Sequence, residues 1–549
     1  MVGVSLGSRP WAEWIYARAS YFVLLGLLGA WAWVSWRWLE RRGESLPALA
    51  RRHWRALACG VATASFVFVS VPPRLRVLSD ETNLLGVAQS FALEKTAYNP
   101  TMAKRYYGQM QVVGRSIEKR ALLYPFLVHI AHVLTGYRWR NGFGVNFVLL
   151  ALLAAGLFGV VAARSGELAA AAAVILVATY PIVSLCAASS DAWLLHAALF
   201  GLLLASLAAF LRSPDEDSLA LLWAQALVFA HTRYEAVLPA AVVLAAAAWR
   251  SPIRREHFVR HWWLYAATPL LLAPLAVQRV LTFGDYQNPP GVAPFSWAHL
   301  LQFGWRLVLA QFKLYDRLVP HAIALNWVAA GCLAWWGYAW SRGTAVFEAA
   351  WQRRWAAACV AAVAAHTVLH LSYYFGDYAF PTSARTVLPL AIAAALAPVA
   401  FHVRFPERLP AGRLLALALL SGLLYHPIAV GAWHTQSLEL IRETDAYQRF
   451  VLARGDEHAL YIYSRPGQIT VLGYGAVDFG WANGHAGELF HEYRRRLYSD
   501  VIAVQRIAYA TGAPLPDDQL DPRFQLDALS EVQIAAERTL RISRVRPLP

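Results

Sequence analysis

Long apolar runs follow one another along the chain, and a run of about 20 residues is needed to cross a bilayer as a helix. Such runs predict twelve spans, at 18–36, 56–72, 143–163, 168–188, 191–211, 219–232, 235–249, 262–282, 321–340, 355–374, 384–401 and 412–433. The sixth and seventh are short and separated only by the sequence HTRYE, so a broken or tilted pair is an alternative there. The pattern predicts a polytopic α-helical membrane protein.

Composition supports this class. Of 549 residues, 58% are hydrophobic and only 15% are charged, whereas a soluble chain carries about a quarter charged residues. A single soluble enzyme is therefore excluded. The net charge of +15 does not indicate nucleic acid, because a membrane chain places its cations in cytoplasmic loops and against lipid phosphates.

The arginines predict the orientation of the spans. If the spans alternate, one side receives Arg37, Arg41, Arg42, Arg51, Arg52, Arg55, Arg250, Arg254, Arg255, Arg260, Arg342, Arg353, Arg354, Arg404, Arg408 and Arg413. Positively charged loops mark the cytoplasm. The opposite, outer side then receives the loops 73–142 and 283–320 and the polar tail 434–549.

Both outer loops contain segments with helical periodicity. Residues 83–93 have apolar positions at helical spacing, and residues 121–134 are apolar enough to lie in the membrane interface. Residues 297–315 form a third candidate interfacial helix, for which a membrane-surface anchor is the plainest interpretation.

The tail has a different pattern, which predicts a small α/β domain. Its expected strands and helices are ALYIYSR (459–465), ITVLGY (469–474), DVIAVQRI (500–507), 438–453 and 487–497. The sequence GYGAVDFG follows an expected strand, but Asp478 stands where a dinucleotide fingerprint needs its third glycine, so a turn is expected. We therefore predict a transmembrane domain at 1–433 and an outer α/β domain at 434–549.

Ionisable residues at membrane depth are costly and usually mark function. Here they gather at the outer ends of the spans, and the set is Asp80, Glu81, Asp191, His231, Arg233, Glu235, Asp285, Asp377 and Arg385. The alternation that orients the spans does not use these residues, yet it places all of them on one face. The pattern predicts an active site on the outer side.

Each of these residues also has a purely structural interpretation. Asp80 and Glu81 could cap the helix that starts near Thr82, and Asp191 could be a helix N-cap. Arg233 and Arg385 could be headgroup anchors that snorkel to the interface.

Other motifs carry less weight. Asp215–Asp217 resembles a metal-binding DxD, but it falls on the cytoplasmic side beside Pro214, where a helix start is expected. His366 and His370 lie one turn apart on a predicted span and lack a third metal ligand, so core histidines are expected there. The four cysteines lie within apolar stretches and are expected to be buried thiols.

Five stretches, in this order, resemble the motifs of the GT-C superfamily of membrane glycosyltransferases: SDETNLLGVAQSFA, EKRALLYPFLVHIAHVLTG, SSDAWLLHAALF, HTRYEAVLP and SARTVLPL. The branch that the chain resembles contains family-39-type, protein-mannosyltransferase-like and aminoarabinose-transferase-like enzymes. Two features depart from the family pattern: an additional span precedes the Asp-Glu loop, and Arg120-Ala121-Leu122 lacks the usual Pro-Pro pair.

The resemblance implies a polyprenyl-phosphate-linked sugar as donor and inversion at the sugar carbon. It also implies that Asp80, with Glu81 as the alternative, takes the proton of the acceptor hydroxyl. Arg233 and Arg385 would then stabilise the departing lipid phosphate.

The remaining candidates surround that chemistry. Lys119 and Arg120 would hold the headgroup of the lipid carrier, and the residues expected to shape the site or contact the acceptor are Asp191, His231, Glu235 and Asp377. Some relatives use a divalent metal and others do not, and no metal ligand set is fixed here. The acceptor is a glycan, a lipid or a protein, and membrane lipids surround the chain.

The same resemblance implies the bacterial inner membrane, with the active site and the tail facing the periplasm. Two alternatives stay open. An O-antigen ligase or polymerase uses similar donors but depends on a large late outer loop, and a transporter or flippase of lipid-linked sugars would be expected to show an internal repeat.

Overall fold

The structure is a computed structural model that describes residues 9–76, 78–249, 255–282, 288–313, 321–342, 347–378, 383–435 and 439–547. The chain divides into two compact units. The first contains Met1–Arg74, Lys119–Tyr124 and Phe143–Thr435, and the second contains Leu75–Glu118, Pro125–Gly142 and Gln436–Pro549. The tail thus shares a unit with two earlier segments. The functional division into domains 1–433 and 434–549 stays a prediction.

The helices up to the α10–α11 turn are α1 (Arg9–Trp14), η2 (Ile15–Ala19), α2 (Ser20–Glu40), α3 (Leu46–Arg52), α4 (Trp54–Ser70), α5 (Leu78–Glu94), α6 (Leu123–Thr135), α7 (Asn141–Ala178), α8 (Pro181–Ala187), α9 (Trp193–Arg212), α10 (Glu216–Ala230) and η3 (Tyr234–Ala236). Those that follow are α11 (Val237–Ala248), α12 (Glu256–Val259), α13 (Trp262–Leu281), α14 (Trp297–Phe312), α15 (Ile323–Ser341), α16 (Ala350–Ser372), η4 (Ala384–Val387), α17 (Leu388–Arg404), α18 (Ala411–Thr435), α19 (Glu439–Arg454), α20 (Gly467–Thr470), α21 (Phe479–Gly484), α22 (Ala486–Arg494) and η5 (Pro516–Asp518).

The strands are β1 (Tyr98–Tyr106), β2 (Gln109–Ile117), β3 (Leu460–Tyr463), β4 (Gly475–Val477), β5 (Val501–Ala508), β6 (Phe524–Ala535) and β7 (Arg538–Pro547). All of them belong to the second unit.

The predicted polytopic helical class with a C-terminal α/β domain is confirmed. Among the described residues, seven stretches are long and apolar enough to cross a membrane: Pro10–Glu40, Asn141–Ala178, Trp193–Arg212, Trp262–Leu281, Ala350–Ser372, Ala384–Arg404 and Ala411–Val430. Three shorter apolar helices accompany them, at Trp54–Ser70, Leu123–Thr135 and Tyr234–Ala248. The chain is a multi-pass membrane protein, and the count of twelve spans stays a prediction.

The predicted span at 168–188 is wrong as a single helix. The helix α7 bends at Gly166, whose φ of 83° interrupts the helical backbone, and it ends at Ala178. A separate short helix, α8, begins at Pro181, and Tyr180 before it is extended, with ψ of 123°. Proline lacks an N–H and disfavours a helical residue ahead of it, so Pro181 explains the break.

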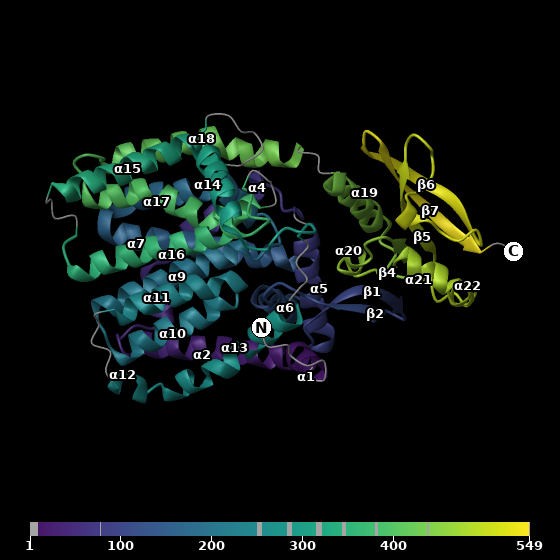
Figure 1. Ribbon diagram of the computed structural model, residues 1–549, viewed down its shortest axis with the longest axis horizontal. Coiled ribbons are helices and arrows are strands. Elements are labelled where there is room, and N and C mark those ends of the chain that lie inside the picture. The colour runs from purple at the N-terminus through teal and green to yellow at the C-terminus, as the bar shows by residue number, and fades with distance from the viewer. Residues whose placement is uncertain are drawn as a thin grey trace. The chain divides into compact units, whose positions relative to one another are not determined.

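Small side chains let the helices of the first unit approach closely. Ala169, Ala170, Ala172 and Ala173 on α7 are fully buried in a hydrophobic core cluster of this unit. The helix α9 packs against α10 and α16, and α11 packs against α16, as Figure 1 shows. This packing brings the ends of α9, α10 and α16 together.

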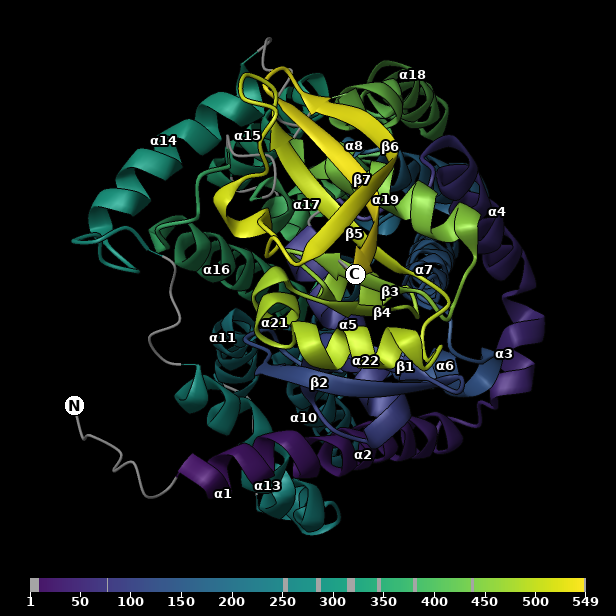
Figure 2. The same ribbon diagram turned by 90° about the vertical axis from the view of Figure 1, so that its right-hand side faces the viewer.

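The second unit is built on one mixed sheet of seven strands in the order β2-β1-β4-β3-β5-β7-β6 (Figure 2). The strands β4, β3 and β5 are parallel, and the others pair antiparallel with their neighbours. Side chains alternate between the two faces of a strand. Accordingly, Tyr461 and Tyr463 pack with α19, whereas Leu460 and Ile462 pack with α21 and α22.

Within the tail, two expectations are corrected. ITVLGY is not a strand, because Gly467–Thr470 form the helix α20, and the strand comes next, at Gly475–Val477. The sequence expected to form a turn, GYGAVDFG, therefore contains β4. Asp478 then caps α21 by accepting the N–H of Trp481 at 2.6 Å. The predicted strands at 459–465 and 500–507 are confirmed by β3 and β5.

The loop 73–142 contains the two expected helical segments and, in addition, two strands that were not expected. The helices α5 and α6 cover the two segments with helical periodicity, but a hairpin of β1 and β2 lies between them. This hairpin joins the sheet of the tail, where Ala103 pairs with Ala476. The tail sheet is therefore completed by a segment more than 300 residues earlier in the sequence.

Candidate active site

Four segments of the first unit meet at the predicted outer ends of the helices. His196 on α9 contacts Thr232 in the HTRYE turn, with Nδ1 and Oγ1 2.8 Å apart. His366 on α16 contacts the backbone carbonyl of Thr386 in η4, with Nε2 and the oxygen 3.1 Å apart. The first contact joins α9 to the turn after α10, and the second joins α16 to η4. Residues predicted from separate motifs thus share one polar cluster.

Arg233 lies in the middle of this cluster. Its guanidinium carbon lies 4.0 Å from the centroid of the Trp193 ring, in a cation–π contact. Its Nε lies 3.3 Å from a carboxylate oxygen of Glu235, and both side chains are about one-fifth exposed. Glu235 thus partly neutralises Arg233, while the indole ring fixes the plane of the guanidinium.

Three histidines complete the cluster. The ring centroids of His366 and His370 are 4.5 Å apart, and those of His196 and His366 are 5.1 Å apart. Trp193 packs against all three of them. Sequence reasoning dismissed His366 and His370 as core residues and did not consider Trp193 or His196.

Several nitrogen atoms of this cluster are buried without a hydrogen-bond partner among the described residues. They are Trp193 Nε1, His196 Nε2, His366 Nδ1 and His370 Nε2. A buried polar atom without a partner costs about 1–3 kcal/mol. Such a concentration of donors and acceptors is typical of a site that binds a polar ligand. Among the described residues, no group of three His, Cys, Asp or Glu is arranged to hold a metal ion.

Asp191 and Arg385 form a buried ion pair. Their side chains are 5% and 13% exposed. The other carboxylate oxygen of Asp191 accepts the N–H of Ala192 at 2.6 Å, and its backbone carbonyl accepts from Asn146 at 3.1 Å. The N-cap of α9 is Ala192, so Asp191 does not cap this helix. Its carboxylate instead orients Arg385.

Lys119 and Arg120 lie beside the HTRYE turn. The hydroxyl of Tyr234 donates to the carbonyl of Lys119, and Gln278 Nε2 donates to the carbonyl of Arg120 at 2.7 Å. Their side chains are half-buried. Arg279 stacks on the same Tyr234, with its guanidinium carbon 5.6 Å from the ring centroid. Sequence reasoning missed Arg279, whose only signal was its position at the outer end of a span.

The remaining predicted residues of the first unit have structural partners. His231 Nε2 lies 2.8 Å from the carbonyl of Leu271 on α13, which ties α10 to that helix. Asp377 pairs with Arg306 on α14. Asp285 lies outside the described residues. A role for His231 or Asp377 in shaping the site stays a prediction.

Asp80 and Glu81 belong to the second unit and lie in the first turn of α5. The carboxylate of Glu81 is fully buried and accepts the backbone N–H of Arg76, so it holds the chain ahead of the helix. Asp80 is half-buried. Of the two carboxylates, Asp80 is the more accessible.

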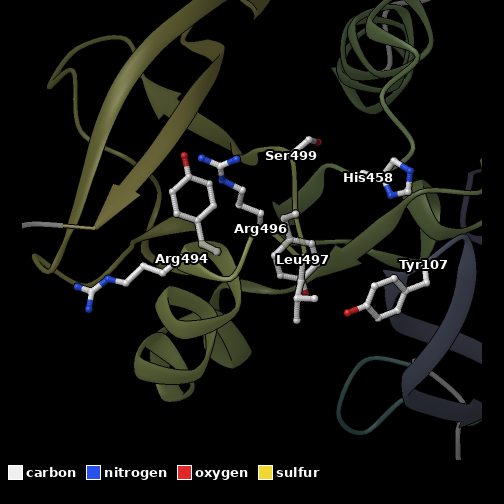
Figure 3. Close-up of a pocket in the computed structure, with 8 residues that line it drawn as sticks. Tyr107, His458, Arg494, Arg496, Leu497 and Ser499 are labelled. Carbon is white, nitrogen blue, oxygen red and sulfur yellow. The ribbon is translucent and has the colours of Figure 1, made fainter.

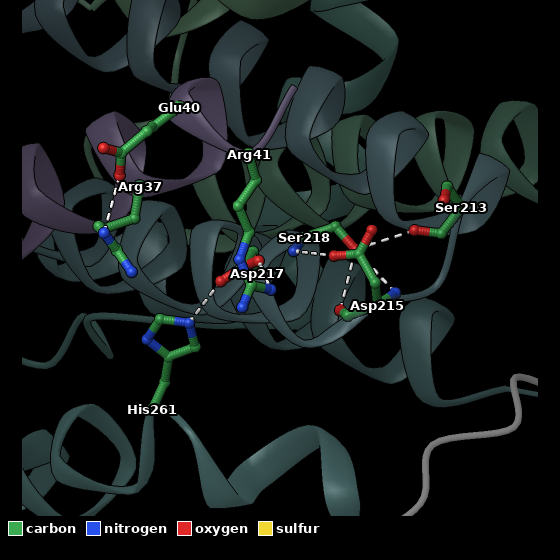
Figure 4. Close-up of polar contacts among 8 residues, drawn as sticks. All are labelled: Arg37, Glu40, Arg41, Ser213, Asp215, Asp217, Ser218 and His261. Carbon is green, nitrogen blue, oxygen red and sulfur yellow. Dashed lines mark hydrogen bonds and ion pairs between the residues drawn. The ribbon is translucent and has the colours of Figure 1, made fainter. Parts of the chain in front are cut away.

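The DxD-like sequence has the structural role that was expected. Asp215 caps α10 by accepting the N–H of Ser218 at 2.7 Å, so the predicted helix start is confirmed. Asp217 pairs with Arg41 and lies 2.8 Å from His261 Nε2 (Figure 4). Its carboxylate connects α2, α10 and the start of α13.

Comparison with known proteins gives a likeness in fold. No family model and no curated relative matches the chain. The chain is similar to the structure of ArnT from Cupriavidus metallidurans bound to undecaprenyl phosphate, at 15% identity over 88% of this chain and 97% of that chain, with a TM-score of 0.47. It is similar to the apo structure of the same protein at 16% identity over 90% and 98% of the two chains, with a TM-score of 0.39. At these identities the likeness concerns the fold and not the activity.

Proposed function

We propose that the protein is a membrane glycosyltransferase that moves a sugar from a polyprenyl-phosphate-linked donor to an acceptor hydroxyl. One observation carries the proposal more than any other. Two arginines from separate GT-C-like motifs, Arg233 and Arg385, are each held by a carboxylate beside the same buried polar cluster. The motif resemblance alone does not require that these two side chains be positioned in this way.

The arginines have a chemical role in such a reaction. As the bond between the sugar and the lipid phosphate breaks, negative charge grows on the departing phosphate oxygen. Guanidinium groups held in a protected site stabilise that charge more strongly than water does. Glu235 and Asp191 keep Arg233 and Arg385 in place before the donor arrives. Lys119 and Arg120 would hold the carrier headgroup.

The acceptor step needs a base. Asp80 takes the proton from the acceptor hydroxyl while that oxygen attacks the sugar carbon, and the polyprenyl phosphate leaves from the opposite side. The sugar carbon is inverted in this single displacement. Glu81 is the alternative base, although its carboxylate already accepts the N–H of Arg76.

The buried nitrogen atoms of the cluster suit sugar hydroxyls. Trp193 Nε1, His196 Nε2 and His370 Nε2 have no hydrogen-bond partner in the part of the chain that the structure describes, and a neutral histidine can both donate and accept hydrogen bonds. We assign this cluster to the donor sugar. Contacts of this kind would determine which sugar the site accepts.

Donor binding can be tested by native mass spectrometry with added undecaprenyl phosphate. We expect the lipid to bind to the wild-type protein and to bind about 10- to 100-fold more weakly to Arg233→Ala and Arg385→Ala, because each loses a charge-assisted contact. Arg404→Ala is the matched control. Arg404 pairs with Glu348 at the other end of α17, and its substitution should leave binding unchanged.

The role of the base is tested separately. Asp80→Asn should bind undecaprenyl phosphate as the wild type does, yet transfer sugar about 100-fold more slowly than the wild type from an added undecaprenyl-phosphate-linked donor that carries a labelled sugar. Native transfer rates in both Asp80→Asn and Glu81→Gln would disprove the proposed base. Wild-type lipid binding in both arginine variants would disprove the donor site.

A further inference from the structure

A pocket of about 660 Å³ opens on the second unit, outside the residues assigned to sugar transfer. Its lining residues are Tyr107, His458, Tyr493, Arg494, Arg496, Leu497, Tyr498 and Ser499. Figure 3 shows Arg496 on one side of Leu497 and Tyr107 and His458 on the other, while Arg494 points away from those two. The pocket thus combines aromatic rings with an exposed arginine, Arg496, in its lining.

The back of the pocket is held in place by hydrogen bonds. Tyr498 is only 2% exposed, and its hydroxyl donates to Glu492 at 3.0 Å and lies 3.0 Å from the hydroxyl of Tyr106. Ser499 donates to Asp456 at 2.7 Å. A ligand would therefore meet a fixed surface, which lowers the entropy cost of binding.

Tyr107 is placed where the backbone favours a different residue. It forms the hairpin tip between β1 and β2 together with Gly108, with φ of 49° and 80° respectively. Such a turn strongly prefers Asn, Asp or Gly at both positions. The sequence nevertheless has a tyrosine there, and its side chain is 87% exposed.

Arg496 also occupies a position where the backbone conformation favours a different residue. It follows α22 with φ of 57°, and the N–H of Leu497 donates to the carbonyl of Glu492 at 3.1 Å, which closes the Schellman motif of this helix. That position normally holds glycine. Two of the three non-glycine residues with positive φ in the described chain therefore line this one pocket. Strained residues cluster at functional sites because their side chains are needed there.

We propose that this pocket binds an anionic carbohydrate. Arg496 pairs with its phosphate or carboxylate, because a guanidinium forms strong charge-assisted hydrogen bonds with both. The rings of Tyr107 and Tyr493 pack against the apolar face of the sugar, and the buried Tyr498 supports them from behind. The volume lies within the range of about 300–1,000 Å³ that is usual for small-molecule sites. The proposal is independent of the transferase assignment.

Equilibrium dialysis of the full-length protein in phosphatidylcholine nanodiscs, with labelled glucose 6-phosphate as the probe, tests the pocket. We expect glucose 6-phosphate to bind at least about 10-fold more tightly than glucose or inorganic phosphate, because only the first engages both the cation and the rings. Equal affinity for glucose 6-phosphate and inorganic phosphate would overturn the proposal. Displacement by nanodiscs that contain phosphatidylinositol would identify a lipid headgroup as the source, and its absence would identify a free sugar.

Two substitutions separate a binding role from a structural one. Arg496→Asn should weaken binding about 10- to 100-fold while raising the melting temperature of the second unit by about 1–3 °C, because asparagine tolerates the left-handed backbone. Arg495→Asn is the matched control, since Arg495 has an ordinary φ of −77° and does not line the pocket. Equal losses of binding in both variants, or a lowered melting temperature in Arg496→Asn, would refute the assignment.

Discussion

Asp191 and Arg385 lie 194 positions apart in the sequence, yet their side chains form one buried ion pair. The sequence marked each residue as an ionisable group at the outer end of a span, but the pairing depends on how α9 and η4 pack. The same limit applies to His196 and His370, which resemble ordinary core histidines until Arg233 and Trp193 are placed beside them. Individual site residues can be predicted from motifs, whereas their partners follow only from tertiary contacts.

The energetics of this ion pair can be measured. The Arg385 side chain is only 13% exposed, and Asp191→Ala removes the carboxylate that pairs with it. Breaking a buried ion pair in this way lowers the free energy of unfolding by about 3–5 kcal/mol. Asp191→Ala combined with Arg385→Leu removes both charges and should cost less than Asp191→Ala alone. Unfolding in mixed SDS micelles, followed by tryptophan fluorescence, gives the free energy of each variant. Additive losses across the two positions would mean that the pair is not coupled.

At the scale of elements, helices were easier to predict than strands. A helix carries its apolar pattern within 20 or so consecutive residues, and each predicted span falls on a helix, although the 168–188 span is broken before Pro181. The strands β1 and β2 went unpredicted because their tip, Tyr107-Gly108, lacks the usual Asn-Gly or Asp-Gly signal. Their place in the sheet depends on the pairing of Ala103 with Ala476, which no local pattern reveals.

Lys104 on β1 makes the attachment of this hairpin dependent on pH. Its ammonium group is 4% exposed and lies 2.7 Å from Glu488 and 3.2 Å from Glu492 on α22. The hydrogen bond from Lys104 lowers the pKa of Glu488 below its ordinary value of 4.5. A lowered folded-state pKa contributes stability above the ordinary value, and this contribution is lost as the pH falls through the lowered one.

Glu488→Gln should therefore destabilise the second unit at pH 7 by up to about 1 kcal/mol, a modest value because the Glu488 side chain is half exposed. The difference from the wild type should shrink as the pH falls below 4.5. Thermal unfolding of the wild type and of Glu488→Gln between pH 7 and pH 3 measures this difference in stability. Glu537→Gln, at the exposed β6–β7 turn, is the control and should show a constant small difference. A Glu488→Gln deficit that persists unchanged at pH 3 would show that packing, and not charge, connects the hairpin to α22.

At the scale of the whole molecule, the distribution of charge predicts how the chain lies in the membrane. If the spans alternate, the arginine-rich loops are predicted on one side, and the ionisable residues at the opposite span ends and the tail on the other. Within the first unit, contacts join α9 to the turn after α10 and α16 to η4. Orientation itself is a property of the membrane, so it follows from the positive-inside rule and needs a direct test.

Cysteine labelling provides that test. The structure has no disulfide at the four native cysteines, Cys59, Cys186, Cys332 and Cys359, so each can be replaced by serine or alanine. In that background, Gly484→Cys in the tail should react with a membrane-impermeant maleimide added to intact cells with a permeable outer membrane, because the tail is predicted to face outward. Arg42→Cys, in the turn after α2, should react only after the inner membrane is opened. Reaction of both positions from the same side would place the tail and the first arginine-rich loop together, and the predicted topology would then be wrong. If both positions react only after the inner membrane is opened, the predicted outward position of the tail is the part that is wrong.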